Sequence, residues 1–154
     1  MSPSVTGTEE TETHSISAES RTETHTVVEA RDFTFGIDEP TEIGGTNAGP
    51  TPVEYLLGAL AGCLNVVGHT VAEELDLEIR TIGIDIEGDL DPRKFLGAAE
   101  EPRPGYQEVA VSLVVDSTAS EEQLETWLEI VEERCPVSDN IANSTPLSFA
   151  VDRR

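Results

Sequence analysis

The segment from Thr51 to Asp76 constrains the fold most, because it predicts one long helix that is apolar on nearly every side. Thr51 is a good N-cap, Pro52 fits the first helical position, and Glu54 completes a capping box with Thr51. A helix that lacks a polar face must be enclosed on most sides. Its uncharged part is about 18 residues long, which is marginal for a membrane span, and it contains glycine, asparagine and histidine. We therefore predict a buried core helix and no membrane partner.

Two glycines on this helix predict contact with a second subunit. Gly58 and Gly62 are four residues apart and place a groove of small residues on one face, where another backbone can approach closely. An equivalent helix of a second copy is one candidate for that backbone. One subunit of 154 residues does not readily cover so apolar a helix. We therefore expect a homodimer.

Alternating apolar residues predict strands on both sides of this helix. Residues 14–39 read as strands, with a turn at Arg31–Asp32 and an earlier hairpin turn near Arg21. Three further strands are expected, at residues 78–88, 107–116 and 147–151. A second helix begins after Ser120 and ends before Pro136. The order βββ-α-ββ-α-β indicates an α+β fold with a largely antiparallel sheet.

Length and composition predict one domain. The chain of 154 residues is large enough for one core. Residues 1–12 are mostly Ser, Thr, Glu, Gly and Pro, so they bury too little surface to order themselves and are predicted to form a disordered acidic tail. Residues 13–154 then form a single domain. The polar, acidic N-terminus shows no secretory signal, so we expect a cytoplasmic protein.

The chain is very acidic. Asp and Glu number 31 against nine Lys and Arg, which gives a net charge of −22. This charge argues against nucleic acid or an anionic membrane as a partner. An acidic surface with Lys94 as its only lysine predicts a halophilic source, because salt screens the self-repulsion of such a surface.

The two cysteines carry the most distinctive chemistry in the chain. Cys63 lies inside the first helix, and Cys135 ends the apolar stripe of the second helix, which runs through Leu124, Trp127, Leu128 and Val131. Their separation of 72 positions is too wide for a CxxC or zinc motif, and the three histidines do not cluster with either, so no metal or cofactor is expected. Two thiols on two helical segments, in a chain that lacks other catalytic chemistry, indicate a thiol redox pair.

Both thiols also have a plain structural interpretation, because free cysteine often packs as a small hydrophobe and a buried thiol is inert. The helix N-terminus lies about three turns from Cys63, too far for its dipole to stabilise a thiolate. Cys135 follows the last turn of its helix and is expected to be easier to expose. A helix C-terminus disfavours a thiolate, which suits a thiol that is attacked rather than one that attacks first.

Five stretches of sequence together resemble the OsmC/Ohr family of thiol-dependent peroxidases, and its general OsmC-like branch most closely. They are Asp38-Glu39-Pro40, GGTNAGPTPVEYLLGALAGC ending at Cys63, Gly88-Asp89-Leu90-Asp91, Pro104-Gly105-Tyr106 and Cys135-Pro136-Val137-Ser138. The combination is specific and spans roughly residues 20–152. The resemblance implies an intertwined homodimer with two sites, each of which uses groups from both subunits.

The resemblance also implies an enzyme that reduces organic hydroperoxides to alcohols in the response to oxidative stress. In that chemistry a thiolate attacks the peroxide oxygen and becomes a sulfenic acid. A second thiol condenses with it to form a redox-active disulfide, which an external dithiol, often lipoyl, reduces. Carried over to this chain, Cys63 is the peroxidatic thiol and Cys135 is the resolving thiol.

An arginine completes the site in the peroxidase branch, where it follows the first strand and approaches the reactive thiol. Arg21 falls within a residue or so of that place. A guanidinium there would stabilise the thiolate and could donate to the leaving hydroxide. Arg31, in the next turn, is the runner-up, and a solvated turn charge is the plain alternative for Arg21.

The acidic residue of that branch is displaced in this chain. It directly follows the proline at the helix start in the family pattern, whereas Val53 occupies that place here and Glu54 lies one residue later. One residue is about 100° of helix rotation. Glu54 is explained as the capping-box acid, so its membership of the site is open, and the usual activity of the family against fatty or aryl hydroperoxides is in doubt.

The loop at residues 90–105 gathers basic charge. It holds Arg93, Lys94 and Arg103, three of the nine basic residues, with Phe95 between them. We expect either local charge balance or a rim that attracts an anionic reductant or hydroperoxide acid. Two other functions stay open. They are a non-catalytic small-molecule-binding dimer of the same fold and another thiol chemistry, such as sulfur transfer, in the same pocket.

Overall fold

The computed structural model describes residues 10–154, so residues 1–9 of the predicted 1–12 tail lie outside the described residues. The chain divides into two compact units. The first holds the residues up to Tyr55 together with Ser144–Arg154, and the second is Leu56–Asn143. Helix α1 (Pro52–Glu74) begins in the first unit and continues through the second. A single domain over residues 13–154 stays a prediction.

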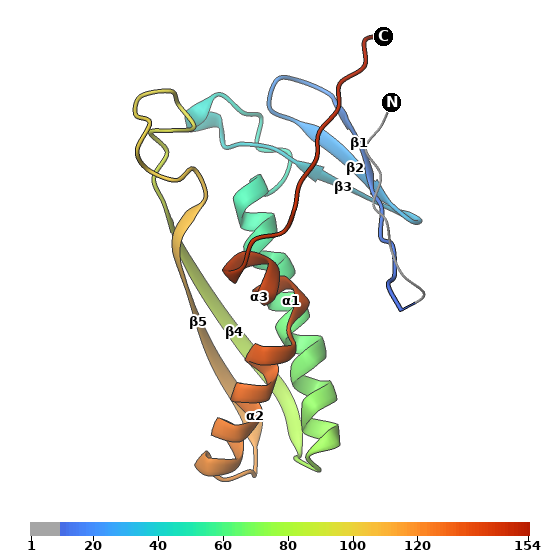
Figure 1. Ribbon diagram of the computed structural model, residues 1–154, viewed down its shortest axis with the longest axis vertical. Coiled ribbons are helices and arrows are strands. Elements are labelled where there is room, and N and C mark those ends of the chain that lie inside the picture. Colours follow the sequence, from blue (N-terminus) through green and yellow to red (C-terminus); the bar gives the residue numbers. More distant parts are fainter. Residues whose placement is uncertain (1–9) are drawn as a thin grey trace. The chain divides into compact units, whose positions relative to one another are not determined.

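The first unit contains a three-stranded antiparallel sheet (Figure 1). Its strands are β1 (Ser17–Ser20), β2 (Thr26–Ala30) and β3 (Phe33–Ile37), in that spatial order. The predicted turn between β2 and β3 is confirmed, with Arg31 at a φ of 55°. The hairpin turn near Arg21 is also confirmed, because the Arg21 N–H donates to the His25 carbonyl at 2.8 Å. A short 3-10 helix, η1 (Thr41–Ile43), follows β3.

Asp38 organises the loop that leads into α1. Its side chain is fully buried. The carboxylate accepts hydrogen bonds from the backbone N–H groups of Glu39 (2.7 Å), Thr46 (3.2 Å) and Ala48 (3.0 Å), and from the Thr46 hydroxyl. These hydrogen bonds, with that of the Thr46 hydroxyl foremost, hold the pKa of Asp38 well below its usual range.

Two glycines let the backbone of this loop pass very close to its neighbours. A Cβ at Gly45 would lie 1.9 Å from the Glu39 carbonyl oxygen, and one at Gly49 would lie 2.3 Å from the Gly36 carbonyl oxygen. No other residue type fits such an approach without moving the backbone. The glycines and Asp38 together fix the path of the chain into α1.

Helix α1 begins as the sequence predicts. The Glu54 N–H donates to the Thr51 hydroxyl at 3.2 Å, and the Thr51 N–H donates to Glu54 Oε1 at 2.8 Å, which completes the capping box. Hydrogen bonding from Thr51 lowers the pKa of Glu54 from its usual value. Tyr55 ties this first turn to β3, because its hydroxyl donates to the Gly36 carbonyl at 2.8 Å and its ring packs against Phe35.

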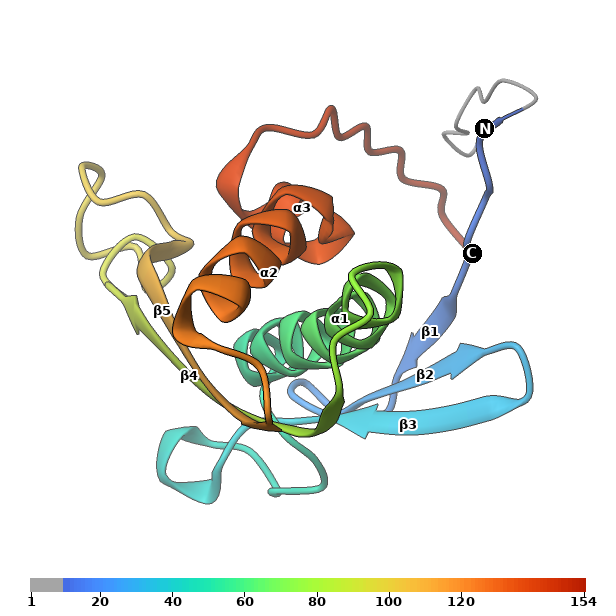
Figure 2. The same ribbon diagram turned by 90° about the horizontal axis from the view of Figure 1, so that it is seen from below.

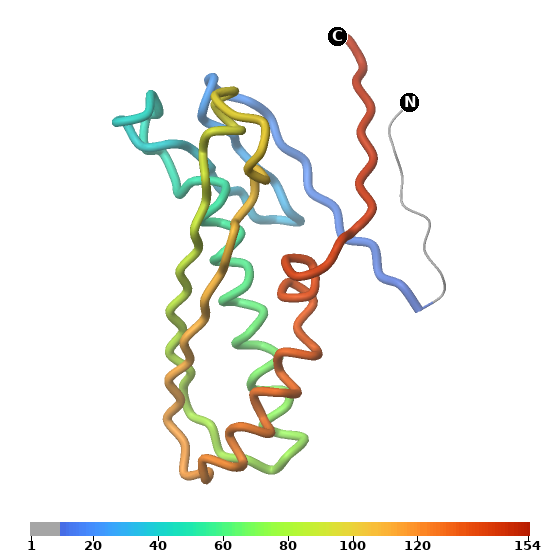
Figure 3. Tube along the Cα trace, turned by 60° about the vertical axis from the view of Figure 1, so that its left-hand side comes forward, coloured from blue at the N-terminus to red at the C-terminus, as the bar shows by residue number. Residues whose placement is uncertain are grey.

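The second unit is a long β-hairpin with helices on one face. Strands β4 (Ile79–Leu90) and β5 (Tyr106–Ser117) pair antiparallel, and α2 (Glu121–Arg134) and α3 (Pro136–Ala142) follow them. Figures 1 and 2 show α1 and α2 on the same side of the hairpin, and Figure 3 shows α1 running alongside it. The predicted α+β fold with antiparallel strands is confirmed.

The hairpin keeps its apolar side toward the helices through one irregularity. Ile79 and Ile82 both pack against the core although they are three residues apart. A register shift between Ile79 and Thr81 allows this, because it changes which residues face the helices. The strand predicted over residues 78–88 is therefore present, and it extends to Leu90.

Trp127 lies at the centre of the packing between α1 and α2. It is 2% exposed, and its indole N–H donates to the Gly68 carbonyl at 2.8 Å. A Cβ at Gly68 would lie 3.0 Å from the Trp127 ring and 2.8 Å from the end of Ile82, so the glycine permits this close approach. The apolar stripe of α2 faces the core as predicted except at Leu128, which is 37% exposed. The other buried residues of this cluster are Leu60, Leu64, Val71, Ala72, Val131 and Cys135.

The strand predicted at residues 147–151 is wrong. This segment has no regular structure and pairs with none of the described strands. Leu147, Phe149 and Val151 are 80%, 90% and 94% exposed. An alternating apolar pattern forms a strand only where another strand edge accepts its hydrogen bonds. None of the described strands provides that edge to this segment.

The prediction that α1 is enclosed on most sides is not met within one chain. By length and composition α1 could cross a membrane, which alone is weak evidence, and 28% of its most apolar window is buried. Val66 is 65% exposed, and nothing lies within 4 Å of the position that a Cβ would take at Gly58 or Gly62. The hairpin and two helices are too few elements to surround a helix of 23 residues. The predicted groove of small residues is open.

Asp38 makes the stability of the first unit depend on pH. Because its folded-state pKa is below the unfolded value of about 3.9, its stabilisation is complete above that value and is lost as the pH falls below it. We expect Asp38→Asn to lower the urea midpoint at neutral pH and to flatten the decline in stability below about pH 4. Circular dichroism across a pH series measures both effects. Asp32→Asn, on the exposed turn, removes the same charge, and equal behaviour of the two variants would contradict the prediction.

Candidate functional site

The two cysteines meet in the second unit. Cys63 lies on α1, and Cys135 lies between the end of α2 and the start of α3. Both are free thiols, and their Sγ atoms are 3.1 Å apart, with the Cys135 S–H placed to donate to Cys63. This distance is about 1 Å longer than a disulfide bond. A small movement of either side chain would join the two sulfurs, so the expected pair of thiols is present.

The exposure of the two thiols is the reverse of the prediction. Cys135 is 1% exposed, whereas Cys63 is partly exposed. The expectation that Cys135 is easier to expose is therefore wrong. Its physical reason is α3, because Pro136 ends α2 but also begins α3, whose residues Val137 and Ile141 pack against the same core.

Helix α3 also changes the electrostatics of Cys135, which the sequence places at a helix C-terminus alone. Cys135 is the C-cap of α2 and the N-cap of α3, and the Ser138 N–H donates to its sulfur at 3.4 Å. Burial is the largest influence on the Cys135 thiol, and it raises the pKa. The Ser138 N–H opposes that rise, and the neighbouring Cys63 sulfur adds to it. Burial therefore makes the Cys135 thiol harder to ionise than an ordinary cysteine.

A cleft with apolar walls adjoins the thiol pair. Its volume is about 390 Å³, and it lies between α1, β5 and the helices that follow. Ser138 belongs both to this cleft and to the contact with Cys135. The residues that line it are Leu60, Leu64, Val109, Val111, Leu113, Leu128, Glu132 and Ser138. An apolar molecule of modest size fits such a lining better than a small polar one.

The basic residues of the 90–105 loop have different surroundings. Arg93 forms a bidentate ion pair with Asp91, with its shortest N–O distance at 2.7 Å. Lys94 and Arg103 donate to nearby backbone carbonyl groups. Arg103 also lines a second cavity of about 450 Å³, together with residues of α1, β5 and α3. Local charge balance therefore accounts for Arg93, while Arg103 is the basic residue that faces a cavity.

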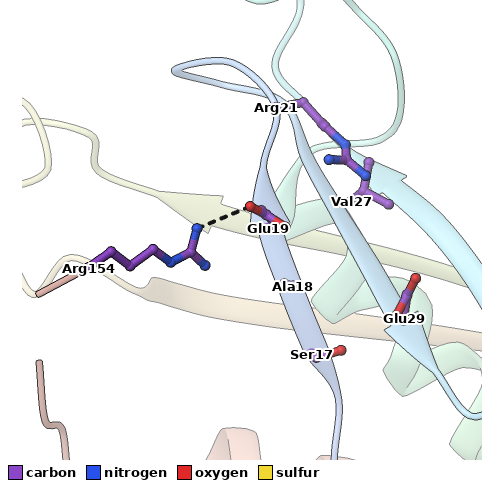
Figure 4. A pocket seen from close by; sticks show the side chains of 7 residues that line it. All are labelled: Ser17, Ala18, Glu19, Arg21, Val27, Glu29 and Arg154. Atoms are coloured by element: carbon purple, nitrogen blue, oxygen red, sulfur yellow. Dashed lines mark hydrogen bonds and ion pairs between the residues drawn. The ribbon is translucent and has the colours of Figure 1, made fainter. Parts of the chain in front are cut away.

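Arg21 lies in the first unit, directly after β1. Figure 4 shows its side chain beside Val27 in a cavity of about 290 Å³ that Glu19, Glu29 and Arg154 also line. Arg154 forms an ion pair with Glu19 at 3.3 Å. Within residues 10–154, Arg21 has no ion pair. Among the described residues, Glu19 and Glu29 share this cavity with Arg21 but form no ion pair with it.

Arg31 and Glu54, the other two charged candidates, both have local partners. The Arg31 guanidinium lies over the Phe33 ring, 5.0 Å from its centroid, and Glu54 is engaged in the capping box. Arg21, Arg31 and Glu54 belong to the first unit, and Cys63 belongs to the second. Their roles toward the thiol stay predictions. In the described part of the chain, no three His, Cys, Asp or Glu residues gather closely enough to hold a metal ion.

Ser138, whose N–H contacts the Cys135 sulfur, is the residue of the candidate site that reasoning from the sequence missed. Its signal was the proline directly after Cys135 with Asp139 three positions further on, which is a pattern of helix starts. That pattern would have placed Cys135 at an N-cap, where nearby backbone N–H groups reach its sulfur.

Comparison with known proteins gives the same fold. The structure is similar to that of an OsmC-like protein from Mycoplasma pneumoniae, with a TM-score of 0.75, 19% identity, and coverage of 85% of this chain and 88% of that one. It is similar to an organic hydroperoxide resistance protein, OsmC, from Legionella pneumophila (TM-score 0.61, 22% identity, 84% and 89% coverage). It is also similar to the organic hydroperoxide resistance protein OhrB of Bacillus subtilis (TM-score 0.55, 22% identity, 83% and 89% coverage).

No curated protein matches the chain in sequence, and identities this low to solved structures show a shared fold alone. The sequence model of one family supplies the stronger assignment. The model described as OsmC-like protein matches residues 45–150, which include both cysteines and the whole second unit. This chain belongs to the OsmC-like protein family.

Proposed function

We propose that the protein reduces organic hydroperoxides to alcohols, with Cys63 as the attacking thiol and Cys135 as the resolving thiol. The observation that carries this proposal is the distance of 3.1 Å between two sulfurs that are 72 positions apart in the sequence. Packing has brought two reactive groups together where one buried thiol alone would be inert. Two further findings support the proposal. The chain belongs to the OsmC-like protein family, and its structural neighbours include organic hydroperoxide resistance proteins.

The reaction proceeds in two steps within one chain. The Cys63 thiolate attacks the outer oxygen of the hydroperoxide, the O–O bond breaks, and the alkoxide takes a proton to leave as the alcohol. Cys63 then carries a sulfenic acid. The Cys135 thiol attacks that sulfur, a disulfide forms, and water leaves. An external dithiol, with lipoyl as one candidate, restores both thiols by exchange.

The difference between the two thiols supports the roles proposed for them. Cys63 is the more exposed sulfur and meets a substrate from solution first. Burial raises the pKa of Cys135, so that it stays protonated and is the poorer first nucleophile. The apolar lining of the adjoining cleft favours an organic substrate over hydrogen peroxide, because hydrogen peroxide has no apolar part to bury there.

Two alternative functions predict different final states of the two thiols. A non-catalytic dimer that binds a small molecule would leave both thiols reduced, and the engagement of Glu54 as a helix cap favours this reading, since it leaves the expected acid of the site unfilled. A sulfur-transfer protein would retain a persulfide on Cys63 instead of forming a disulfide. A cytoplasmic location, a role in oxidative stress and a halophilic source belong to the leading proposal.

We also propose that the protein acts as a homodimer. Within one chain α1 keeps Gly58, Gly62 and Val66 uncovered, so an apolar face of the helix that carries Cys63 meets water. A second copy would cover the part of this face that Gly58, Gly62 and Val66 form. Because a site between subunits uses groups from both, Arg21 of one copy is a candidate to stabilise the thiolate of the other.

Oxidation by an organic hydroperoxide tests the main proposal. One equivalent of cumene hydroperoxide should lower the protein mass by two hydrogen atoms and leave no thiol that iodoacetamide can alkylate. Cys63→Ser should consume no hydroperoxide. Cys135→Ser should complete one turnover and hold a sulfenic acid on Cys63 that dimedone traps. Two alkylatable thiols after treatment would support the non-catalytic alternative, and trapping only in the Cys63 variant would reverse the roles.

Paired substitutions separate Arg21 from Glu54. Arg21→Met should slow alkylation of Cys63 at neutral pH, because the thiolate loses a nearby cation, and Arg21→Lys should restore part of the rate. Glu54→Ala should cost on the order of 1 kcal/mol of stability through the lost capping box and leave the alkylation rate unchanged. The measurement is the pH profile of alkylation beside the urea midpoint. A large change of reactivity in Glu54→Ala without loss of stability would place Glu54 in the site.

The dimer can be tested by whether one substitution in the groove, Gly62→Ala, stabilises the protein or weakens its self-association. If the groove is free, Gly62→Ala should stabilise α1 by about 1 kcal/mol through helix propensity alone, since its Cβ meets nothing. If another backbone packs there, the same change should weaken the dimer. Analytical ultracentrifugation in high salt measures the dissociation constant, and urea unfolding of the same variant measures its stability. A folded monomer at all concentrations would rule the dimer out.

A further inference from the structure

The two sulfurs of the site differ sharply in access from solution. Cys135 is 1% exposed and is covered by α3, while Cys63 is partly exposed on α1. Thiol–disulfide exchange needs the incoming sulfur to approach along the line of the bond that breaks, so access to the attacked sulfur limits the rate. Of the two residues only Cys63 is partly open to solvent, so attack on its sulfur disturbs the core less than attack on Cys135.

The surroundings of Cys135 suit a departing sulfur. The Ser138 N–H points at Cys135 Sγ from 3.4 Å, and the Val137 N–H also acts on this sulfur in the direction that favours the thiolate. Hydrogen bonds from backbone N–H groups to a charged acceptor are stronger than those to a neutral one. The start of α3 therefore holds donors in place for negative charge that forms on Cys135.

We infer that, in the disulfide form, an external dithiol attacks the Cys63 sulfur and Cys135 departs as the thiolate, received by the Ser138 N–H. This inference rests on the proposed function and adds the point at which the reductant engages the site. The mixed disulfide of the reductant is then formed on Cys63 and never on Cys135.

The step balances as ordinary exchange. One thiolate of the dithiol forms a bond to Cys63 Sγ, and the bond between Cys63 and Cys135 breaks, with its electron pair going to Cys135. The second thiol of the reductant then attacks the other sulfur of the same reductant molecule, the one that is bonded to Cys63 in the mixed disulfide. Cys63 leaves as the thiolate, the reductant closes to a cyclic disulfide, and two electrons have passed to the protein.

Two effects oppose each other in deciding which sulfur of the disulfide the reductant attacks. Burial raises the pKa of Cys135, and a thiol of higher pKa is the poorer leaving group. Attack at Cys135 would instead expel the more exposed Cys63, but the reductant would first have to open the packing around a sulfur that is 1% exposed. The Ser138 N–H reduces the penalty for a thiolate at Cys135, whereas attack at Cys135 requires the packing of Val137 and Ile141 around it to open. Access therefore decides the direction of attack.

Mapping the first mixed disulfide tests the inference directly. The thiols of the full-length protein are oxidised with diamide, so that the test does not depend on hydroperoxide activity. Excess 2-mercaptoethanol is then added, the reaction is stopped with acid at early times, and peptide mass spectrometry locates the adduct. We expect the adduct on Cys63. An adduct on Cys135, or equal amounts on both, would overturn the inference. If diamide but not hydroperoxide forms the disulfide, the proposed function fails while this result still stands.

A matched pair of variants tests the role of the Ser138 N–H. Ser138→Pro removes the donor, and residue 138 lies in the first turn of α3, where proline is best tolerated in a helix. Ser138→Ala keeps the donor and removes only the hydroxyl. We expect reduction of the disulfide by dithiothreitol to be roughly three- to tenfold slower in Ser138→Pro than in Ser138→Ala. Equal rates in the two variants, when both are folded, would overturn the role of the Ser138 N–H. If the proline variant does not fold, adduct mapping on the unaltered chain still decides which sulfur the reductant attacks.

Discussion

The buried hydrogen bond from the Trp127 indole to the Gly68 carbonyl sets the position of α2 along α1, and the thiol pair depends on that position. Trp127 and Cys135 belong to one buried face of α2, and Gly68 and Cys63 belong to one helix. A shift of α2 by a single residue would move Cys135 by about 1.5 Å along the axis. The sulfurs would then no longer meet. Close packing at a glycine therefore creates the reactive pair, with no covalent link between the two helices.

The position of Cys135 at a junction gives it two conflicting influences. As the last residue on the buried stripe of α2 it loses contact with water, which favours the neutral thiol. As the first residue before α3 it faces the N–H groups of a new helix, which favour the thiolate. Burial dominates in the reduced protein, and the amides matter when charge develops during exchange. Cys135 can thus be an unreactive thiol in the reduced protein and an acceptable leaving group during thiol–disulfide exchange.

Local signals predicted most of the elements, because capping, turns and periodicity act over a few residues. The start of α1 at Pro52, the start of α2 after Ser120 and the turn at Arg31 lie where the sequence places them. Helix α3 was missed because Pro136 both ends α2 and begins α3, and the apolar stripe of α2 predicts only the ending. The strand at residues 147–151 failed because strand formation needs a partner edge that no short stretch of sequence reveals. No local pattern joins residues 72 positions apart. The pairing of the two cysteines followed from the lack of other catalytic chemistry in the chain, and their separate roles followed from the family resemblance.

Trp127 is the only tryptophan in the chain. Its indole packs in the same buried cluster as Cys135, on the helix face that leads directly to the thiols. The ultraviolet fluorescence of the whole protein therefore comes chiefly from one fixed position in that cluster. Sulfur is an effective quencher of excited indole, and any rearrangement that accompanies a change of oxidation state alters the packing around this ring. The fold has placed one intrinsic optical probe in the buried cluster against which both cysteines pack, so a change in the packing of that cluster can be followed in real time without a label.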